Sequence, residues 1–318
     1  MSSTTKIAVI QAAPSFLNKD KTIQKIIRLS VEAGRKGARL IVFPEAFLPG
    51  YPRGFTFGVH VGNRTEQGRI LWQRYYENAL DVNGPDLSRI GEVARKINAF
   101  ISLGVVEKEG GTLFCSNFFF GPEGTLLGKH RKLKPTAAER FIWGEGDGST
   151  LTTLDTEMGI LGSLICWENY MPLARMAMYN KGIQIYIAPT ADQRESWQWT
   201  MRHIAIEGRC FVLSCNQYIN TDFIPEDILQ LEDIKDPAGF VCRGGSVVVA
   251  PSGELLAGPL WDREGILYAD LDLGAVARGK FDLDVSGHYN RPDVFKFEVA
   301  GQPPVLKIPS KSKPSEKG

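Results

Sequence analysis

The chain has 318 residues, 43% of them hydrophobic and 23% charged, and its formal net charge is +1. These values are ordinary for a globular, enzyme-sized protein, and they argue against nucleic acid or an anionic membrane as a partner. No apolar run approaches the length that spans a bilayer, and the first residues lack the apolar core of a secretory signal.

The cysteines and histidines follow no disulfide or metal-binding pattern. The five cysteines are an odd number without CxxC spacing, which argues against a disulfide framework and favours a reducing, cytoplasmic compartment. The four histidines are scattered along the chain, so the sequence indicates no metal site.

The first part of the chain alternates β-rich runs with segments of helical periodicity. Strands are expected at 6–10 and 40–43, on either side of a helix whose apolar residues recur at 23, 26, 27 and 31. Pro85 opens a second helix, and a third strand is expected at 100–106. This repeated β-α-β pattern predicts an α/β fold.

Two similar hairpins predict that the chain consists of two related halves. Residues 118–127 and 247–256 each join an apolar strand to a second strand through a Pro-x-Gly turn. The second half repeats the strand-helix-strand order of the first, at 159–165, 172–179 and 183–187. We therefore expect one domain over residues 1–301, a pseudo-two-fold β-sandwich clothed by helices.

Three segments stand outside this order. Residues 51–80, rich in glycine and aromatic residues, are expected to form a loop and a helix over the site. The acidic stretch 222–236 is interpreted as a solvated surface loop, and the proline- and lysine-rich residues 302–318 as a disordered tail.

Cys166 is the leading candidate for chemistry, because a strand-like apolar run ends abruptly on it. Parallel strands of α/β sheets present functional residues at their carboxyl ends. A second buried run, 40–43, ends in Pro44-Glu45, so Glu45 meets Cys166 if the two strands are neighbours. Considered alone, Cys166 could instead be a buried structural cysteine, and Glu45 a solvated loop residue.

Cys166 needs a base, because an unperturbed thiol is only a few per cent thiolate at neutral pH. Glu45 is the candidate base, and Lys132, just after the expected hairpin, is the candidate cation that stabilises a thiolate or a developing anion. Lys134 competes with Lys132 for this role. A Glu, a Lys and a Cys are the minimum for hydrolysis of a carbon–nitrogen bond by a thiol.

Three ordered motifs resemble the catalytic motifs of the nitrilase branch of the carbon–nitrogen hydrolases. They are 43–47 (FPEAF), 130–136 (HRKLKPT) and 166–169 (CWEN), and similar flanking segments lie at 51–54, 139–148, 188–192 and 287–293. The resemblance implies a Glu45-Lys132-Cys166 triad in an α-β-β-α sandwich that assembles as a homodimer or a larger spiral homo-oligomer. Glu139 matches a further family carboxylate, which lies beside the lysine and helps to position substrate or water.

Trp167 follows the expected nucleophile at a strand-to-helix turn. Its backbone N–H is placed to stabilise negative charge on the reacting group, so we count it as substrate-binding, although its indole has a core position as the alternative. The Cys-Trp-Glu sequence favours nitrilases over amidases and carbamoylases. Glu168 is interpreted as a cap or hydrogen-bond partner that holds the turn.

The expected activity is hydrolysis of an organic nitrile to its carboxylic acid and ammonia, through a thioimidate and a thioester on Cys166. It needs two waters and no metal or organic cofactor. An amidase or carbamoylase with the same fold, and a non-catalytic binding protein, are the alternatives. The sequence does not select the nitrile, and its aromatic candidates for pocket or core are Phe55, Phe57, Trp72, Trp143 and Trp197.

Overall fold

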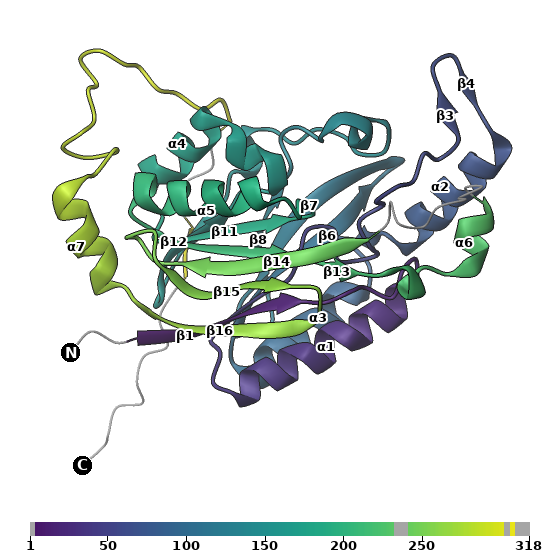
Figure 1. Ribbon diagram of the computed structural model, residues 1–318, viewed down its shortest axis with the longest axis horizontal. Coiled ribbons are helices and arrows are strands. Elements are labelled where there is room, and N and C mark those ends of the chain that lie inside the picture. The colour runs from purple at the N-terminus through teal and green to yellow at the C-terminus, as the bar shows by residue number, and fades with distance from the viewer. Residues whose placement is uncertain (1–3, 232–240, 302–305, 309–318) are drawn as a thin grey trace.

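The computed structural model describes residues 4–231, 241–301 and 306–308, and shows two facing sheets between two layers of helices (Figure 1). The first sheet has the order β16-β1-β2-β6-β7-β8, with β5 beside β6. Its strands are β1 (Thr4–Gln11), β2 (Leu40–Val42), β5 (Leu80–Asp81), β6 (Phe100–Glu109), β7 (Thr112–Phe120), β8 (Leu126–Arg131) and β16 (Gly265–Asp272).

The second sheet has the order β13-β14-β12-β11-β10-β9-β17, with β15 beside β14. Its strands are β9 (Thr153–Thr156), β10 (Gly159–Ser163), β11 (Ile185–Thr190), β12 (Phe211–Asn216), β13 (Tyr218–Ile219), β14 (Cys242–Val249), β15 (Leu255–Trp261) and β17 (Leu306–Lys307). A separate hairpin of β3 (Val59–His60) and β4 (Asn63–Arg64) projects from the body (Figure 1).

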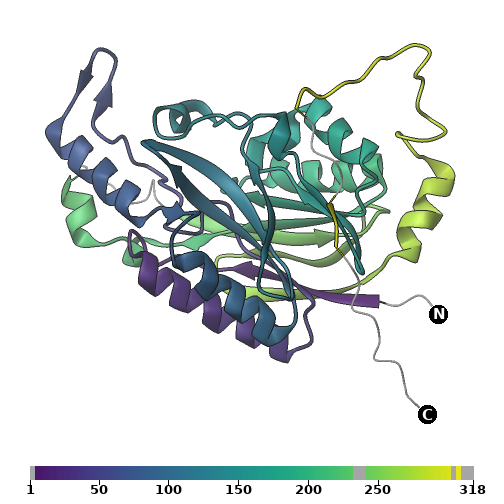
Figure 2. The same cartoon turned by 180° about the vertical axis from the view of Figure 1, so that it is seen from behind.

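Helices cover the outer face of each sheet, which confirms the α-β-β-α sandwich (Figure 2). Side chains that alternate along β1 are buried on both faces of the sheet. Ile7 and Val9 lie in the core between the sheets, whereas Ala8 and Ile10 lie in the core beneath α1 and α3. The second sheet is covered in the same way by α4 and α5. The helices are α1 (Lys19–Arg35), α2 (Glu66–Asn78), α3 (Asp86–Ile97), α4 (Pro172–Asn180), α5 (Glu195–Gly208), α6 (Glu226–Leu231) and α7 (Gly274–Asp282).

The two halves repeat the same topology, as predicted. In the series β1-β2-β6-β7-β8 and β10-β11-β12-β14-β15, the first three strands run parallel and the next two antiparallel. The Pro-x-Gly turns match too, because Gly124 and Gly253 both have a φ of +85°. Each half also lends a strand: β9 follows the first half but pairs with β10, and β16 follows the second half but pairs with β1.

Two expectations differ from the structure. The acidic stretch is not simply a surface loop, because α6 forms within it and Ile224 and Ile228 are buried in a core that also contains Leu71 and Tyr75 of α2. Of the segment expected to be a disordered tail, residues 306–308 are described, and Leu306–Lys307 pair with β9 as β17. The remaining residues of that segment, and 232–236, lie outside the described residues.

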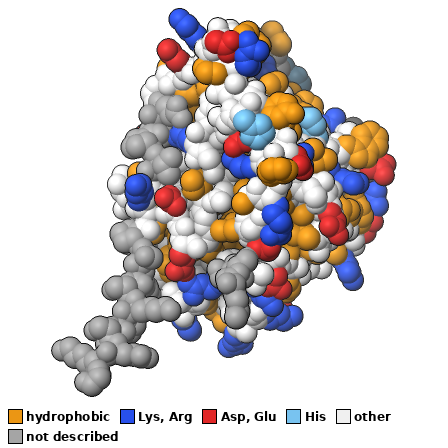
Figure 3. Space-filling model, turned by 90° about the vertical axis from the view of Figure 1, so that its left-hand side faces the viewer, with side chains coloured by type: hydrophobic (Ala, Val, Ile, Leu, Met, Phe, Trp, Pro, Cys, Tyr) orange, Lys and Arg blue, Asp and Glu red, His pale blue; other side chains and the backbone are white. Residues whose placement is uncertain are grey.

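The segment 51–80 contains the expected helix, α2, together with the projecting β3–β4 hairpin. None of the helices described is both long and apolar enough to cross a bilayer. On the face shown in Figure 3, acidic and basic side chains are interspersed, in keeping with the near-neutral net charge.

Candidate active site

Cys166 lies at the carboxyl end of β10, where a short 3-10 helix, η3 (Cys166–Tyr170), begins. Its φ is +50°, in the left-handed region that residues with side chains rarely adopt. Asn169 holds this turn by donating from Nδ2 to the carbonyl oxygens of Leu164 at 2.9 Å and Cys166 at 2.7 Å. A strained backbone held in this way indicates a functional constraint on the thiol.

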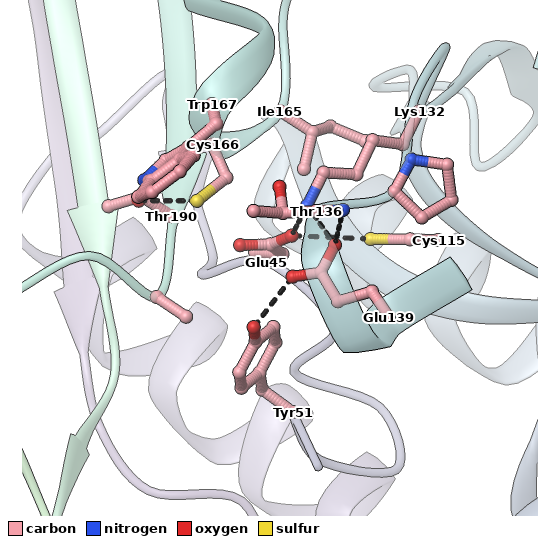
Figure 4. A network of polar contacts seen from close by, with 12 residues as sticks. Glu45, Tyr51, Cys115, Lys132, Thr136, Glu139, Ile165, Cys166, Trp167 and Thr190 are labelled. Atoms are coloured by element: carbon pink, nitrogen blue, oxygen red, sulfur yellow. Dashed lines mark hydrogen bonds and ion pairs between the residues drawn. The ribbon is translucent and has the colours of Figure 1, made fainter. Parts of the chain in front are cut away.

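Glu45 lies beyond the carboxyl end of β2 and is completely buried. The predicted meeting with Cys166 occurs, although β2 and β10 belong to facing sheets and are not neighbours in one sheet. Glu45 Oε1 accepts hydrogen bonds from Lys132 Nζ at 2.7 Å and, weakly, from Cys115 Sγ at 3.6 Å. Oε2 is buried without a hydrogen-bond partner, on the side of Cys166 (Figure 4).

Lys132 follows β8 and is buried, with its ammonium group between two carboxylates (Figure 4). Nζ lies 2.7 Å from Glu45 Oε1 and 2.7 Å from Glu139 Oε2. Lys134, the competing lysine, is half-exposed and pairs with Glu145 away from this cluster. Of the two candidate lysines, Lys132 is therefore the one that lies beside Glu45.

Glu139 lies in the 3-10 helix η1 (Ala137–Phe141), and both of its carboxylate oxygens accept hydrogen bonds. Oε2 accepts from the backbone N–H of Thr136 at 2.6 Å as well as from Lys132, and Oε1 accepts from the Tyr51 hydroxyl at 2.6 Å. The carboxylate is thus fixed from two sides.

Three contacting residues were not assigned from the sequence: Tyr51, Cys115 and Thr190. Thr190, at the end of β11, donates from Oγ1 to Cys166 Sγ at 3.2 Å. Tyr51 lies in a segment already singled out for its similarity, and Thr190 lies in another, so position within those segments was the available signal. Cys115 carried none.

The electrostatics of the cluster favour a neutral thiol at rest. Burial, and then the negative charge of Glu45, raises the pKa of Cys166 above its ordinary value, with Lys132 opposing. Burial also raises the pKa of Glu45, which Lys132 offsets only in part and the charge of Glu139 augments. Burial lowers the pKa of Lys132, but the neighbouring carboxylates outweigh it and hold that pKa well above its usual range, so the lysine stays charged.

With both carboxylates ionised around Lys132, the cluster carries two negative charges and one positive charge. A thiolate formed by losing a proton to solvent would add a third negative charge in a buried place, at high cost. Transfer of the proton from Cys166 to Glu45 leaves the charge of the cluster unchanged. The arrangement therefore suits Glu45 as the proton acceptor.

The cluster opens into a pocket of about 320 Å³. Trp167 is 41% exposed at its wall, where its indole N–H donates to Asp192 Oδ2 at 2.9 Å. Arg194 forms an ion pair with the same carboxylate and lies over the Trp167 ring, with Cζ 4.8 Å from the ring centroid. The indole is therefore part of the pocket and not of the core. The lining residues are Tyr51, Arg53, Thr136, Glu139, Cys166, Trp167, Ala191, Asp192, Gln193 and Arg194.

Comparison with known proteins agrees with this geometry. The family model described as carbon-nitrogen hydrolase matches residues 6–281. The chain belongs to this family. Within it, the chain is 50% identical over 304 residues to a bifunctional nitrilase/nitrile hydratase, NIT4A, of Lupinus angustifolius, covering 94% of this chain and 87% of the relative. It is also 50% identical to an aliphatic nitrilase of Sinorhizobium fredii (strain HH103), covering 94% and 96%.

Among solved structures, the chain resembles a carbon-nitrogen hydrolase from Helicobacter pylori G27 with a TM-score of 0.68. The two share 23% sequence identity, over 93% of this chain and 99% of the other. That likeness supports the fold, and the sequence identity to the curated relatives places the chain among the nitrilases.

Proposed function

We propose that this carbon–nitrogen hydrolase converts an organic nitrile to its carboxylic acid and ammonia, with Cys166 as the nucleophile. The observation that carries the proposal is the buried cluster in which Glu45 lies between the Cys166 thiol and the Lys132 ammonium (Figure 4). The curated relatives, named as nitrilases, support the choice of nitriles over other carbon–nitrogen substrates.

In the first half of the reaction, Glu45 accepts the thiol proton as Cys166 Sγ attacks the nitrile carbon. Thr190 Oγ1 supports the developing thiolate by its hydrogen bond. The nitrile nitrogen takes up negative charge, which Lys132 and the backbone N–H of Trp167 stabilise. The proton that Glu45 took from the thiol then passes to this nitrogen, which completes a thioimidate and makes Glu45 a base again. Tyr51 and Glu139 hold Lys132 in place for this task.

In the second half, Glu45 acts as a base toward water, which adds to the thioimidate to give a tetrahedral carbon. Protonation of its nitrogen lets ammonia leave and a thioester form. A second water, activated in the same way, releases the carboxylic acid and restores the thiol. Every proton in this scheme moves between Glu45, Lys132, the substrate and water.

The test is ammonia and acid release from a panel of nitriles, beside the matched amides. The wild type is expected to turn over nitriles much faster than amides. Cys166→Ala is expected to abolish turnover while the protein stays folded, and Cys115→Ala, which removes a second thiol of the same cluster, is the matched control and keeps measurable activity. Ammonia release by Cys166→Ala at the wild-type rate would refute the assignment.

We further infer that the chain up to residue 301 folds as one domain, because β9 and β16 each complete the sheet of the other half. We also infer assembly as a homodimer or larger homo-oligomer. The outer helix layer supports this by exposing large apolar side chains, with Leu173 71% and Trp199 67% exposed. Sedimentation velocity of Trp199→Glu, expected to shift the protein toward monomer, tests it.

The five cysteines are all free and buried, which supports a reducing, cytoplasmic location. Fractionation of cells that express the tagged chain tests this part of the proposal.

A further inference from the structure

A second buried carboxylate, Glu168, lies behind the nucleophile and is 1% exposed. Its Oε2 accepts from the backbone N–H of Ile165 at 2.6 Å, and its Oε1 accepts from the backbone N–H of Leu133, also at 2.6 Å. His130 Nε2 lies 2.9 Å from Oε2 and 3.2 Å from Oε1. From the sequence, Glu168 was expected only to hold the turn after Cys166. The structure shows that it also binds His130 and the backbone of Leu133.

The hydrogen bonds fix one proton between His130 and Glu168. His130 Nδ1 lies 3.0 Å from the carbonyl oxygen of Thr150, which can only accept, so Nδ1 carries a hydrogen. If the ring were neutral with its hydrogen on Nδ1, Nε2 would be an acceptor facing the Glu168 carboxylate, which is also an acceptor, and no hydrogen bond could form. A proton must lie between them, and the pair is neutral as a whole while remaining strongly hydrogen-bonded.

The two backbone groups held by Glu168 belong to the segments that carry the proposed reaction. Ile165 precedes Cys166, and Leu133 follows Lys132. The segments come from different sheets, β10 and β8, so this single carboxylate ties together two parts of the chain that strand pairing does not connect. Ile165, Cys166 and Lys132 lie together in Figure 4.

We propose that Glu168 and His130 form a positioning pair that sets the placement of Cys166 relative to Lys132 and thereby decides whether the enzyme releases acid or amide. The inference rests on the proposed nitrile hydrolysis. The tetrahedral carbon carries the sulfur, an amino group, a hydroxyl group and the organic substituent. Either the carbon–nitrogen or the carbon–sulfur bond can break from it.

In the acid branch, the amino group gains a proton, the carbon–nitrogen bond breaks and ammonia leaves, while the hydroxyl group loses a proton and becomes the carbonyl of a thioester. In the amide branch, the carbon–sulfur bond breaks, its electron pair goes to sulfur and a proton from Glu45 restores the thiol. The hydroxyl group loses its proton to Glu45 and becomes the carbonyl of an amide. The first branch needs the nitrogen beside Lys132 and the second does not. A wider or looser Lys132–Cys166 arrangement therefore favours amide.

The test measures the ratio of amide to acid produced from one nitrile by the full-length chain. This ratio does not depend on the amount of folded enzyme, because unfolded chains make neither product. Glu168→Gln places an amide NH₂ against a backbone N–H, and His130→Leu removes the side-chain partner of Glu168. Each is expected to raise the ratio about tenfold, a difference of about 1.4 kcal/mol between the two barriers. Their kcat is expected to fall about 100-fold.

Two further variants separate positioning from general support of the fold. His130→Gln, which keeps an N–H donor toward Glu168, is expected to restore a ratio near that of the wild type. Glu107→Gln is the matched control, because Glu107 is also a completely buried carboxylate that pairs with β8, through Lys129 and Arg131, but does not contact the nucleophile turn. It is expected to lower stability and leave the ratio unchanged.

The proposal is overturned if Glu168→Gln and His130→Leu lower kcat with an unchanged ratio, or if Glu107→Gln changes the ratio as much as they do. Failure of the proposed function is a different result, since the wild type would then release neither acid nor amide from any nitrile.

Discussion

Replacing Glu139 by Gln tests how charge is distributed in the cluster, because it removes one negative charge and keeps the size of the side chain. Glu139 and Glu45 both lie 2.7 Å from Lys132 Nζ, so their bonded oxygens are no more than about twice that distance apart. Two like charges about 5 Å apart repel by about 3 kcal/mol at an effective dielectric constant of about 20, an upper limit that corresponds to about two pKa units.

The sign follows from the causes of the shift. The charge of Glu139 is one of the influences that raise the pKa of Glu45, so its removal lowers that pKa and lets Glu45 remain a base in more acidic solution. The acid limb of kcat/KM against pH is expected to move down by about one to two units. Tyr51→Phe, which keeps the charge of Glu139 and removes its hydrogen bond, is the control and is expected to leave the limb near its wild-type position. An acid limb that stays in place or moves upward in Glu139→Gln would refute the reasoning.

Three more predictions follow from single contacts. Lys132→Met leaves two buried carboxylates without their shared cation, so the free energy of unfolding, measured by chemical denaturation at pH 7, is expected to fall by about 3–5 kcal/mol. This loss should shrink as the pH falls and the carboxylates protonate, and an equal loss at pH 5 would contradict the prediction. Thr190→Val removes a hydrogen bond that lowers the pKa of Cys166, so alkylation of that thiol at fixed pH should slow about tenfold. Peptide mass spectrometry measures the rate, and an unchanged rate would show that Thr190 does not support the thiolate. Trp167→Phe loses the bond to Asp192, and KM should rise more than kcat falls, whereas a pure kcat effect would place the indole elsewhere in the mechanism.

The sequence predicted the elements that carry the site better than it predicted how they meet. The apolar runs before Glu45 and Cys166 are strands because they are buried on both faces, and both residues lie just beyond the carboxyl ends of those strands. That the strands belong to facing sheets depends on packing between the sheets, which no local pattern encodes.

The residues that sequence reasoning missed act through tertiary contacts. Cys115 lies within β7, where alternation predicts only burial, and its contact with Glu45 requires the fold. Helix α6 was missed because its acidic residues suggested solvent, although Ile224 and Ile228, four positions apart, already had helical spacing. None of the five aromatic residues considered for the pocket lines it.

Mass spectrometry of the acid-quenched enzyme during nitrile turnover tests the central claim most directly. The account predicts a covalent adduct with the mass of the acyl or imidoyl group of the substrate, located by peptide mapping on Cys166. An adduct on Cys115, or steady ammonia release with both thiols unmodified under conditions that trap intermediates, would contradict it.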